Sequence, residues 1–135
     1  MHDVPVIGLH GRARAGKDTV ANFILAHRGG YIYSFADPIR KMLIPLGIDM
    51  NDPYWQARKE QVIPALGASP RRLMQTLGTE WGRQLINPDL WLILAKQLLL
   101  NYGPGMVIAD VRFENEAAWV REQGGRVIHI ERPDN

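Results

Sequence analysis

The chain has 135 residues, a length suited to one domain with a substantial buried core. Its 16 Lys and Arg residues against 14 Asp and Glu residues leave a formal net charge of +2, which is short of the basic stripe that nucleic-acid binding usually needs. The absence of cysteine excludes disulfide scaffolds, thiolate zinc sites and thiol nucleophiles. Composition therefore favours a globular protein that does not bind nucleic acid.

Apolar strand-like runs alternate with helical patterns along the chain. In order, the sequence predicts a strand at 4–9, a helix at 18–27, a strand at 31–35, helices from 37, at 54–63, at 71–81 and at 90–101, a strand at 106–110, a helix at 114–123 and a strand at 127–130. Strands separated by helices imply parallel pairing with right-handed crossovers. We therefore predict an α/β fold in one layered domain that spans residues 1–135.

The apolar stretches are too short to cross a bilayer. The longest, residues 90–100, is interrupted by Lys96 and Gln97, whereas a spanning helix needs about 20 apolar residues. The first five residues lack the basic and apolar regions of a secretory signal. We therefore expect a soluble protein that makes no contact with membranes.

Local patterns also predict helix caps and buried positions. Asp37, Ser69 and Asn87 each precede a proline, and each is expected to cap the helix that follows. Helical spacing places four side chains on one face of helix 18–27: Val20, Phe23, Ile24 and His27. Ala117, Ala118, Val120 and His129 are also expected to face the core, whereas Trp81, Trp91 and Trp119 are expected either in the core or in a pocket wall.

A glycine-rich loop joins the first predicted strand to the first predicted helix. It consists of Gly11, Arg12, Ala13, Arg14, Ala15, Gly16, Lys17, Asp18 and Thr19. Glycines let backbone N–H groups converge on a phosphate chain, the helix N-terminus favours the anion, and the lysine reaches the outer phosphates. The spacing Gly-x4-Gly-Lys therefore predicts a phosphate-binding loop, whereas a dinucleotide fingerprint would need closer glycines.

One residue departs from the usual form of such loops. Ser or Thr normally follows the lysine and binds Mg²⁺, but here Asp18 follows Lys17, and Thr19 comes one residue later. An aspartate at this place could hold the metal through a water molecule or hydrogen-bond a reacting group.

A second candidate site lies at the junction between the strand at 106–110 and the helix at 114–123. Asp110 ends the strand, at the edge where ligands bind in open α/β sheets. A carboxylate there either helps to order Mg²⁺ or its waters, as in P-loop proteins, or caps the following turn. Arg112, Glu114, Asn115 and Glu116 concentrate further polar groups at this junction.

Basic side chains also gather in the middle helices: Arg40, Lys41, Arg71, Arg72 and Arg83. Phosphoryl transfer is catalysed mainly by positioning and by cations that stabilise the transferred charge, and arginine also binds an acceptor's phosphate. Any one of these residues could be a solvated surface cation, so the inference rests on the group.

Four sequence blocks together resemble one known family. They are Gly16-Lys17-Asp18-Thr19, Phe35-Ala36-Asp37-Pro38, residues 73–80 with Arg83, and residues 110–117. In this order they resemble the phage-type deoxynucleoside monophosphate kinases, which are P-loop enzymes of the nucleoside monophosphate kinase-like fold. The resemblance implies a three-layer P-loop NTPase fold, with a short parallel sheet flanked by helices, and a helical acceptor-binding insertion at about 36–101.

The resemblance also implies a reaction and its residues. The enzyme would transfer the γ-phosphoryl group of ATP, with Mg²⁺, to a deoxynucleoside monophosphate in the cytoplasm, which is the host cytoplasm if the chain is phage-encoded. Residues 11–19 would bind ATP, and Asp18 and Asp110 would hold the metal through water. The acceptor would be bound by Phe35, Ala36, Asp37, Lys41, Arg72, Gln75, Thr79 and Arg83. The catalytic residues would be Lys17, Asp18, Arg72 and Arg112.

The resemblance implies a fold that is shortened at its C-terminus. Members of the family usually continue past the last predicted strand with a further strand and helices that help to form the base pocket and lid, whereas this chain ends at Asn135. Two other functions stay open: a small-molecule kinase similar to animal phosphomevalonate kinase, which shares the Gly-Lys-Asp loop, and a nucleotide-binding protein without catalysis. Base preference and oligomeric state, a homodimer included, are also open.

Overall fold

The computed structural model describes residues 4–12 and 16–131, and its chain divides into two compact units. Unit 1 comprises Met1–Phe35 and Leu94–Asn135, and unit 2 comprises Ala36–Ile93. In chain order the elements of unit 1 are β1 (Val6–His10), α1 (Lys17–Arg28), β2 (Tyr31–Tyr33), β3 (Met106–Ile108), α6 (Glu114–Glu122) and β4 (Arg126–His129). Those of unit 2 are α2 (Asp37–Met42), η1 (Ile44–Leu46), α3 (Pro53–Gln56), α4 (Pro70–Gln75) and η2 (Thr76–Ile86). Helix α5 (Leu90–Tyr102) begins in unit 2 and ends in unit 1.

Unit 1 is built on a four-stranded sheet in the order β2-β3-β1-β4, and each neighbouring pair is parallel. The register pairs Val6 with Met106 and Gly8 with Val127. Because parallel neighbours need crossover connections, the helices between the strands must cover the faces of the sheet. The predicted parallel α/β fold is confirmed.

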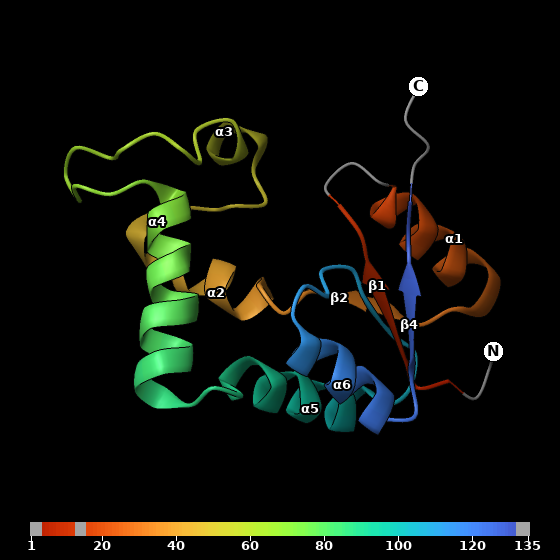
Figure 1. Cartoon of the computed structure of the whole chain (residues 1–135). Helices are drawn as coiled ribbons and strands as arrows, with labels where there is room; N and C mark the ends of the chain where they lie inside the picture. The colour runs from red at the N-terminus through yellow and green to blue at the C-terminus, as the bar shows by residue number, and fades with distance from the viewer. Residues whose placement is uncertain (1–3, 13–15, 132–135) are drawn as a thin grey trace. The chain divides into compact units, whose positions relative to one another are not determined.

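Figure 1 shows β1 together with the helices α1 and α6 of unit 1. Side chains alternate along β1, so those of successive residues face different helices. Ile7 and Leu9 form a buried cluster with Ala21 and Ile24 of α1. On the opposite face, a Cβ placed on Gly8 would lie 3.2 Å from a methyl group of Val120 in α6. The two helices therefore cover opposite faces of the sheet, which gives the predicted three layers.

Two strands are shorter than the sequence predicts, since 31–35 is a strand only over Tyr31–Tyr33 and 106–110 only over Met106–Ile108. The reason lies in a side chain: the backbone N–H of Phe35 donates to Asp110 Oδ1, at 2.9 Å, instead of continuing the ladder between strands. The apolar pattern correctly located both strands, but it could not show where a carboxylate would replace backbone pairing.

The predicted faces of the two long helices of unit 1 are confirmed only in part. On α1, Ile24 is buried, but Phe23 is 61% exposed and stacks on His27 with ring centroids 4.1 Å apart. The small side chain of Ala21 takes the expected place of Phe23 against the sheet, because it allows a closer approach of helix and strand. On α6, Ala117, Trp119 and Val120 are buried and Ala118 is half-buried.

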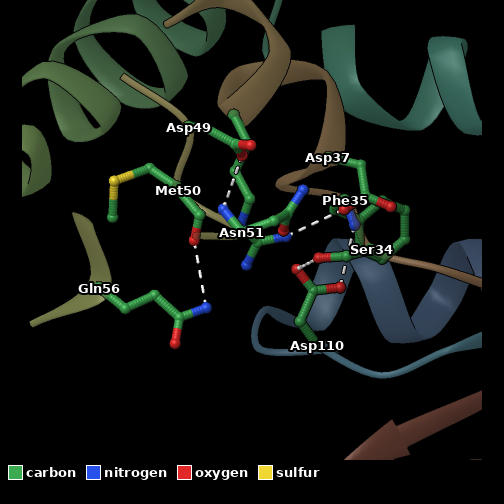
Figure 2. A network of polar contacts seen from close by, with 9 residues as sticks. Ser34, Phe35, Asp37, Asp49, Met50, Asn51, Gln56 and Asp110 are labelled. Carbon is green, nitrogen blue, oxygen red and sulfur yellow. Dashed lines mark hydrogen bonds and ion pairs between the residues drawn. The ribbon is translucent and has the colours of Figure 1, made fainter. Parts of the chain in front are cut away.

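Unit 2 consists of short helices joined by irregular segments. Its buried cluster is formed by Leu43, Ile48 and Met50, and partly buried side chains of α3, α4 and η2 pack against this cluster. A polar contact also stabilises the segment from Met50 to Gln56. The Gln56 side-chain amide donates to the Met50 carbonyl oxygen at 3.1 Å, as Figure 2 shows. The unit is therefore held by a small core together with side-chain hydrogen bonds to the backbone.

The predicted caps are confirmed at two of three helices. Ser69 Oγ accepts from the Arg72 N–H at 3.2 Å, and Asn87 Oδ1 accepts from the Asp89 N–H at 2.8 Å. The prediction for Asp37 is wrong, because Ala36 is the N-cap of α2 and Asp37 is the first helical residue. Its carboxylate instead pairs with Arg40 at 3.0 Å, which satisfies the charge without capping.

Two helix predictions in unit 2 are wrong in extent or type. The predicted helix at 54–63 covers only Pro53–Gln56, because backbone groups beyond it make other bonds: Lys59 accepts from the Arg71 N–H, and Ile63 accompanies Ala68 in an antiparallel bridge. The predicted helix at 71–81 is α-helical only over Pro70–Gln75 and continues as a π-helix over Thr76–Ile86. Within the described residues, no helix is long and apolar enough to cross a membrane.

Candidate functional site

The loop between β1 and α1 begins and ends on glycines that the structure requires for different reasons. A Cβ on Gly11 would lie 2.5 Å from the backbone oxygen of Ile130, so no larger residue fits there. Gly16 has φ 96° and ψ 21°, the left-handed conformation that favours glycine, and it is the N-cap of α1. The intervening Ala13, Arg14 and Ala15 lie outside the described residues. Both ends of the predicted phosphate loop are thus held in fixed backbone positions.

Lys17 is the first residue of α1, and its ammonium bonds back to the loop. Nζ donates to the Gly11 carbonyl oxygen at 2.9 Å. The first-turn amides of Lys17, Asp18 and Thr19 have no carbonyl partner inside the helix, because the first intrahelical bond runs from Val20 N to Gly16 O. Asp18 and Thr19 are exposed. A cation, helix amides and hydroxyl or carboxylate oxygens therefore come together at the start of α1, a combination suited to a phosphate chain.

Asp110 follows β3 by two residues and is bound at the end of β2. Ser34 Oγ donates to Asp110 Oδ2 at 2.5 Å, and the Phe35 N–H donates to Oδ1 at 2.9 Å (Figure 2). Both carboxylate oxygens therefore accept hydrogen bonds at the carboxyl edge of the sheet, next to the strand that leads into the Gly11–Thr19 loop. The aspartate fixes the place where β2 ends, in addition to any contact it makes with a ligand.

Arg112 and Glu116 have distinct places in the junction before α6. Glu116 is 4% exposed, and its Oε1 accepts from the backbone N–H groups of Arg112, at 2.8 Å, and Phe113, at 3.0 Å. Glu116 thus makes the glutamate half of a capping box, but the N-cap is Phe113, which has no side-chain acceptor, so the usual Ser/Thr-x-x-Glu signal is absent from the sequence. The Arg112 side chain is exposed. Glu116 therefore orients the backbone that presents Arg112.

The expected acceptor residues near the end of β2 differ in exposure. The Phe35 ring is 2% exposed and lies edge-on to Trp119, with ring centroids 6.0 Å apart. Asp37 and Arg40 form their ion pair at the surface of unit 2, Ala36 is half-buried, and Lys41 is exposed. Phe35 thus packs into the core of unit 1, and its contact with an acceptor stays a prediction.

The other expected acceptor residues follow one another along α4 and η2 at intervals of three or four: Arg72, Gln75, Thr79 and Arg83. Such intervals keep side chains on one side of a helix. Arg72 and Gln75 are exposed, and Thr79 and Arg83 are half-buried. Arg83 Nη1 donates to Thr79 Oγ1 at 3.1 Å and to the Gly78 carbonyl at 3.3 Å. The structure therefore brings Thr79 and Arg83 into direct contact.

The prediction that His129 lies in the core is wrong. Its side chain is 53% exposed, because β4 is a sheet edge whose last residue points outward. Nδ1 lies 3.0 Å from His10 Nδ1, and Nε2 lies 3.2 Å from Glu131 Oε1. Trp91 and Trp119 are buried, as expected of core residues, and Trp81 is half-buried. Elsewhere in unit 1, burial raises the pKa of Tyr31, whose hydroxyl donates to Gly103 O at 2.7 Å.

Asp18 and Asp110 are the residues expected to hold a metal ion. Among the residues that the structure describes, no three His, Asp or Glu side chains form a metal-binding group. Mg²⁺ bound with a nucleotide needs only one or two carboxylates, since phosphates and waters supply its other ligands. The exposed carboxylate of Asp18 fits that requirement, and Asp110, whose oxygens accept protein hydrogen bonds, fits a contact through water.

Fold and loop together define a class of protein: a small α/β protein with a P-loop kinase-like fold, in which a glycine-bounded loop and a lysine follow the first strand of a parallel sheet. Comparison with known proteins narrows this class. A sequence model described as deoxynucleotide monophosphate kinase matches residues 66–135.

Two curated proteins are similar over most of the chain. A protein of Acanthamoeba polyphaga mimivirus named "Putative deoxynucleotide monophosphate kinase" is 31% identical over an alignment of 143 positions, which covers 95% of this chain and 74% of the relative. The deoxynucleoside-5'-monophosphate kinase of Escherichia phage T5 is 29% identical over 183 positions, which cover 87% of this chain and 72% of the relative. This chain belongs to the deoxynucleotide monophosphate kinase family, a family of phosphotransferases. The resemblance seen in the four sequence blocks is confirmed.

Proposed function

We propose that this chain transfers the γ-phosphoryl group of ATP to a deoxynucleoside monophosphate. An oxygen of the acceptor's phosphate forms a bond to the γ-phosphorus, and the bond from that phosphorus to the β,γ-bridging oxygen breaks. The products are ADP and a deoxynucleoside diphosphate. Family membership supports the reaction, and one observation carries the donor site: the Lys17 ammonium is held in the loop by the Gly11 carbonyl.

On the donor side, the loop from Gly11 to Thr19, Arg12, Ala13, Arg14 and Ala15 included, would bind the phosphates of ATP. Lys17 would exchange its neutral carbonyl partner for anionic phosphate oxygens, because a charge-assisted hydrogen bond is about twice as strong as a neutral one. The amides at the start of α1 would then donate to the same phosphates. Lys17 would act catalytically by neutralising charge that grows on the transferred group.

Mg²⁺ would be held by Asp18 and, through a water molecule, by Asp110. When bound, the ion neutralises the charge of the nucleotide phosphates. Asp110 would at the same time keep Ser34 and Phe35 in place through its two hydrogen bonds. Arg112, exposed beside the Glu116 cap, would add a cation for the transferred group.

Unit 2 would supply most of the groups that bind the acceptor, as a helical insertion in a single kinase domain. Arginines suit this task because the planar guanidinium binds a phosphate through two parallel hydrogen bonds. Arg72 and Arg83 would bind the acceptor's phosphate, with Arg72 also acting catalytically, and Gln75 and Thr79 would supply hydrogen bonds. The remaining acceptor groups of the proposal are Phe35, Ala36, Asp37 and Lys41.

An ADP-release assay with a panel of acceptors tests the proposal. We expect turnover with at least one deoxynucleoside monophosphate, and we expect Lys17→Ala to lower kcat by at least ~10²-fold, as removal of a preorganised charge does in comparable sites. Lys59→Ala, which removes an exposed lysine of unit 2, is the matched control and should leave kcat unchanged.

Three results would contradict the proposal. Activity that survives Lys17→Ala would exclude the loop as the donor site. Phosphorylation of a non-nucleotide acceptor, such as phosphomevalonate, but of no deoxynucleoside monophosphate would assign a different kinase. Binding of ATP without turnover of any acceptor would leave a nucleotide-binding protein.

A further inference from the structure

The segment that carries Thr79 and Arg83 has an unusual backbone. It is a π-helix of 11 residues, Thr76–Ile86, whereas π geometry mostly occurs as single turns inside α-helices and often at functional sites. A π-helix of this length needs support beyond its backbone hydrogen bonds, because the wide turn gives poorer internal packing. Contacts from outside the helix must therefore stabilise it.

Trp91 makes the most direct of these contacts. Its side chain is 2% exposed, and Nε1 donates to the Gly78 carbonyl oxygen at 2.8 Å. Its ring also lies against Gly82, where an added Cβ would be 2.6 Å from Cζ2 of the ring. Gly78 and Gly82 are both buried. One indole therefore fixes two successive turns of the π-helix, by a hydrogen bond to one and by close packing on the other.

The same carbonyl is linked to Arg83. Gly78 O accepts from Trp91 Nε1 at 2.8 Å and from Arg83 Nη1 at 3.3 Å, and the same Nη1 donates to Thr79 Oγ1 at 3.1 Å. A carbonyl oxygen has two lone pairs, so the short bond from the indole leaves Arg83 the second, weaker place. If the indole donor were removed, the guanidinium could move further onto Gly78 O and away from Thr79.

We propose that Trp91 is a positioning residue for the acceptor site. It holds the Gly78 carbonyl and the Gly82 turn, and so fixes the direction in which Thr79 and Arg83 meet the acceptor's phosphate. The inference rests on the proposed function, because it takes Thr79 and Arg83 as acceptor-binding groups. It adds a residue that touches no substrate and acts through the backbone of η2.

Trp91→Phe tests the inference, because phenylalanine keeps an aromatic ring near Gly82 but removes the N–H donor. We expect KM for the deoxynucleoside monophosphate, and its Kd in a calorimetric titration, to rise about three- to tenfold, the range that one hydrogen bond supports. The KM for ATP should stay unchanged and kcat should change by less than about twofold. A merely structural role would instead lower thermal stability without separating the two KM values.

Three further variants sharpen this test. Trp55→Phe makes the same substitution in unit 2 at a ring that packs against the Leu43–Ile48–Met50 cluster, and it should leave KM for the acceptor unchanged. In an Arg83→Ala background, Trp91→Phe should no longer raise KM for the acceptor, because the group that it positions is missing. Gly82→Ala, which would displace the ring, should raise that KM more than Trp91→Phe does.

The outcomes separate this inference from the proposed function. If the wild-type chain phosphorylates deoxynucleoside monophosphates and Trp91→Phe leaves their KM and Kd unchanged, the inference is wrong and the function stands. An equal rise in the KM for ATP would also overturn it, as would an undiminished effect in the Arg83→Ala background. A wild-type chain that phosphorylates no deoxynucleoside monophosphate would overturn the proposed function, and the inference with it.

Discussion

The two units place their polar groups in different ways. In unit 1, the loop and Asp110 are joined to strands of a parallel sheet, and Gly11 is constrained by the backbone oxygen of Ile130, the residue after β4. In unit 2, Thr79 and Arg83 lie on a π-helix held by the Trp91 side chain. A sheet can hold a phosphate loop by local backbone geometry, whereas short helices depend on a few side-chain contacts.

The difference suits the two tasks that we propose. Binding of a triphosphate requires backbone amides in a fixed arrangement, and a strand–loop–helix unit supplies them within nine residues of sequence, 11–19. Binding of an acceptor relies on long side chains, whose direction can change with a single supporting contact. Substitutions in the two units should therefore differ in whether they change chemistry, folding or acceptor binding.

Asp110→Asn should have the largest effect of the substitutions that compare the units. Asparagine can still accept from the Phe35 N–H and can donate to Ser34 Oγ, so the free energy of unfolding should fall by less than about 1 kcal/mol. Loss of the charge should lower kcat/KM about 10- to 100-fold, as loss of an outer-shell metal partner does. Steady-state kinetics over a range of Mg²⁺ concentrations measure the change in kcat/KM, and urea unfolding measures the change in the free energy of unfolding. An unchanged Mg²⁺ dependence would show that Asp110 acts only on the end of β2.

Gly11→Ala and Gly78→Ala compare the two units directly. The added methyl group on Gly11 would meet backbone, the Ile130 oxygen at 2.5 Å, so the free energy of unfolding should fall by about 1–3 kcal/mol. The methyl group on Gly78 would meet the flexible tip of Ile39, Cδ1 at 2.8 Å, which can rotate away, so the loss should be smaller. Urea denaturation followed by circular dichroism gives both values. Equal losses would show that the two glycines are equally constrained.

Ser69→Ala should have the smallest effect. It removes the side chain that accepts from the Arg72 N–H at the start of α4, and loss of such a cap costs about 1 kcal/mol. Thermal unfolding measures this loss, with Ser69→Asp as the control that keeps a capping oxygen. Kinetic constants for ATP should not change. A full loss of folding would show that unit 2 depends on α4 far more than its small core indicates.

Prediction from sequence was most accurate where structure is local. The loop between β1 and α1, the caps Ser69 and Asn87, and the first three residues of the strand predicted at 106–110 each depend on neighbouring residues, and the structure has them where the sequence predicts them. Asp110 was recognised as a polar group at the sheet edge, but its partners Ser34 and Phe35 are about 75 residues away in sequence. Spacing alone could not identify them.

Prediction failed where distant contacts override local preference. The sequence pattern of residues 57–63 favours a helix. In the structure this segment forms turns instead, and its backbone hydrogen-bonds to Arg71 and Ala68. His129 lies in an apolar pattern, yet the outer place of β4 in the sheet leaves it exposed. Nothing in the sequence of residues 76–86 distinguishes a π-helix from an α-helix, and the Trp91 bond to the Gly78 carbonyl joins residues 13 apart in sequence.

The sequence by itself therefore determined the order of strands and helices, the α/β class and the place of the glycine-bounded loop between β1 and α1, because periodicity, glycine and capping residues act over a few positions. The tertiary structure alone decided where strands end, that Glu116 is a buried cap, and that Arg83 shares the Gly78 carbonyl with Trp91. Those arrangements arise from hydrogen bonds between side chains and backbone groups far apart in the chain, which satisfy polar groups only once folding has brought them together.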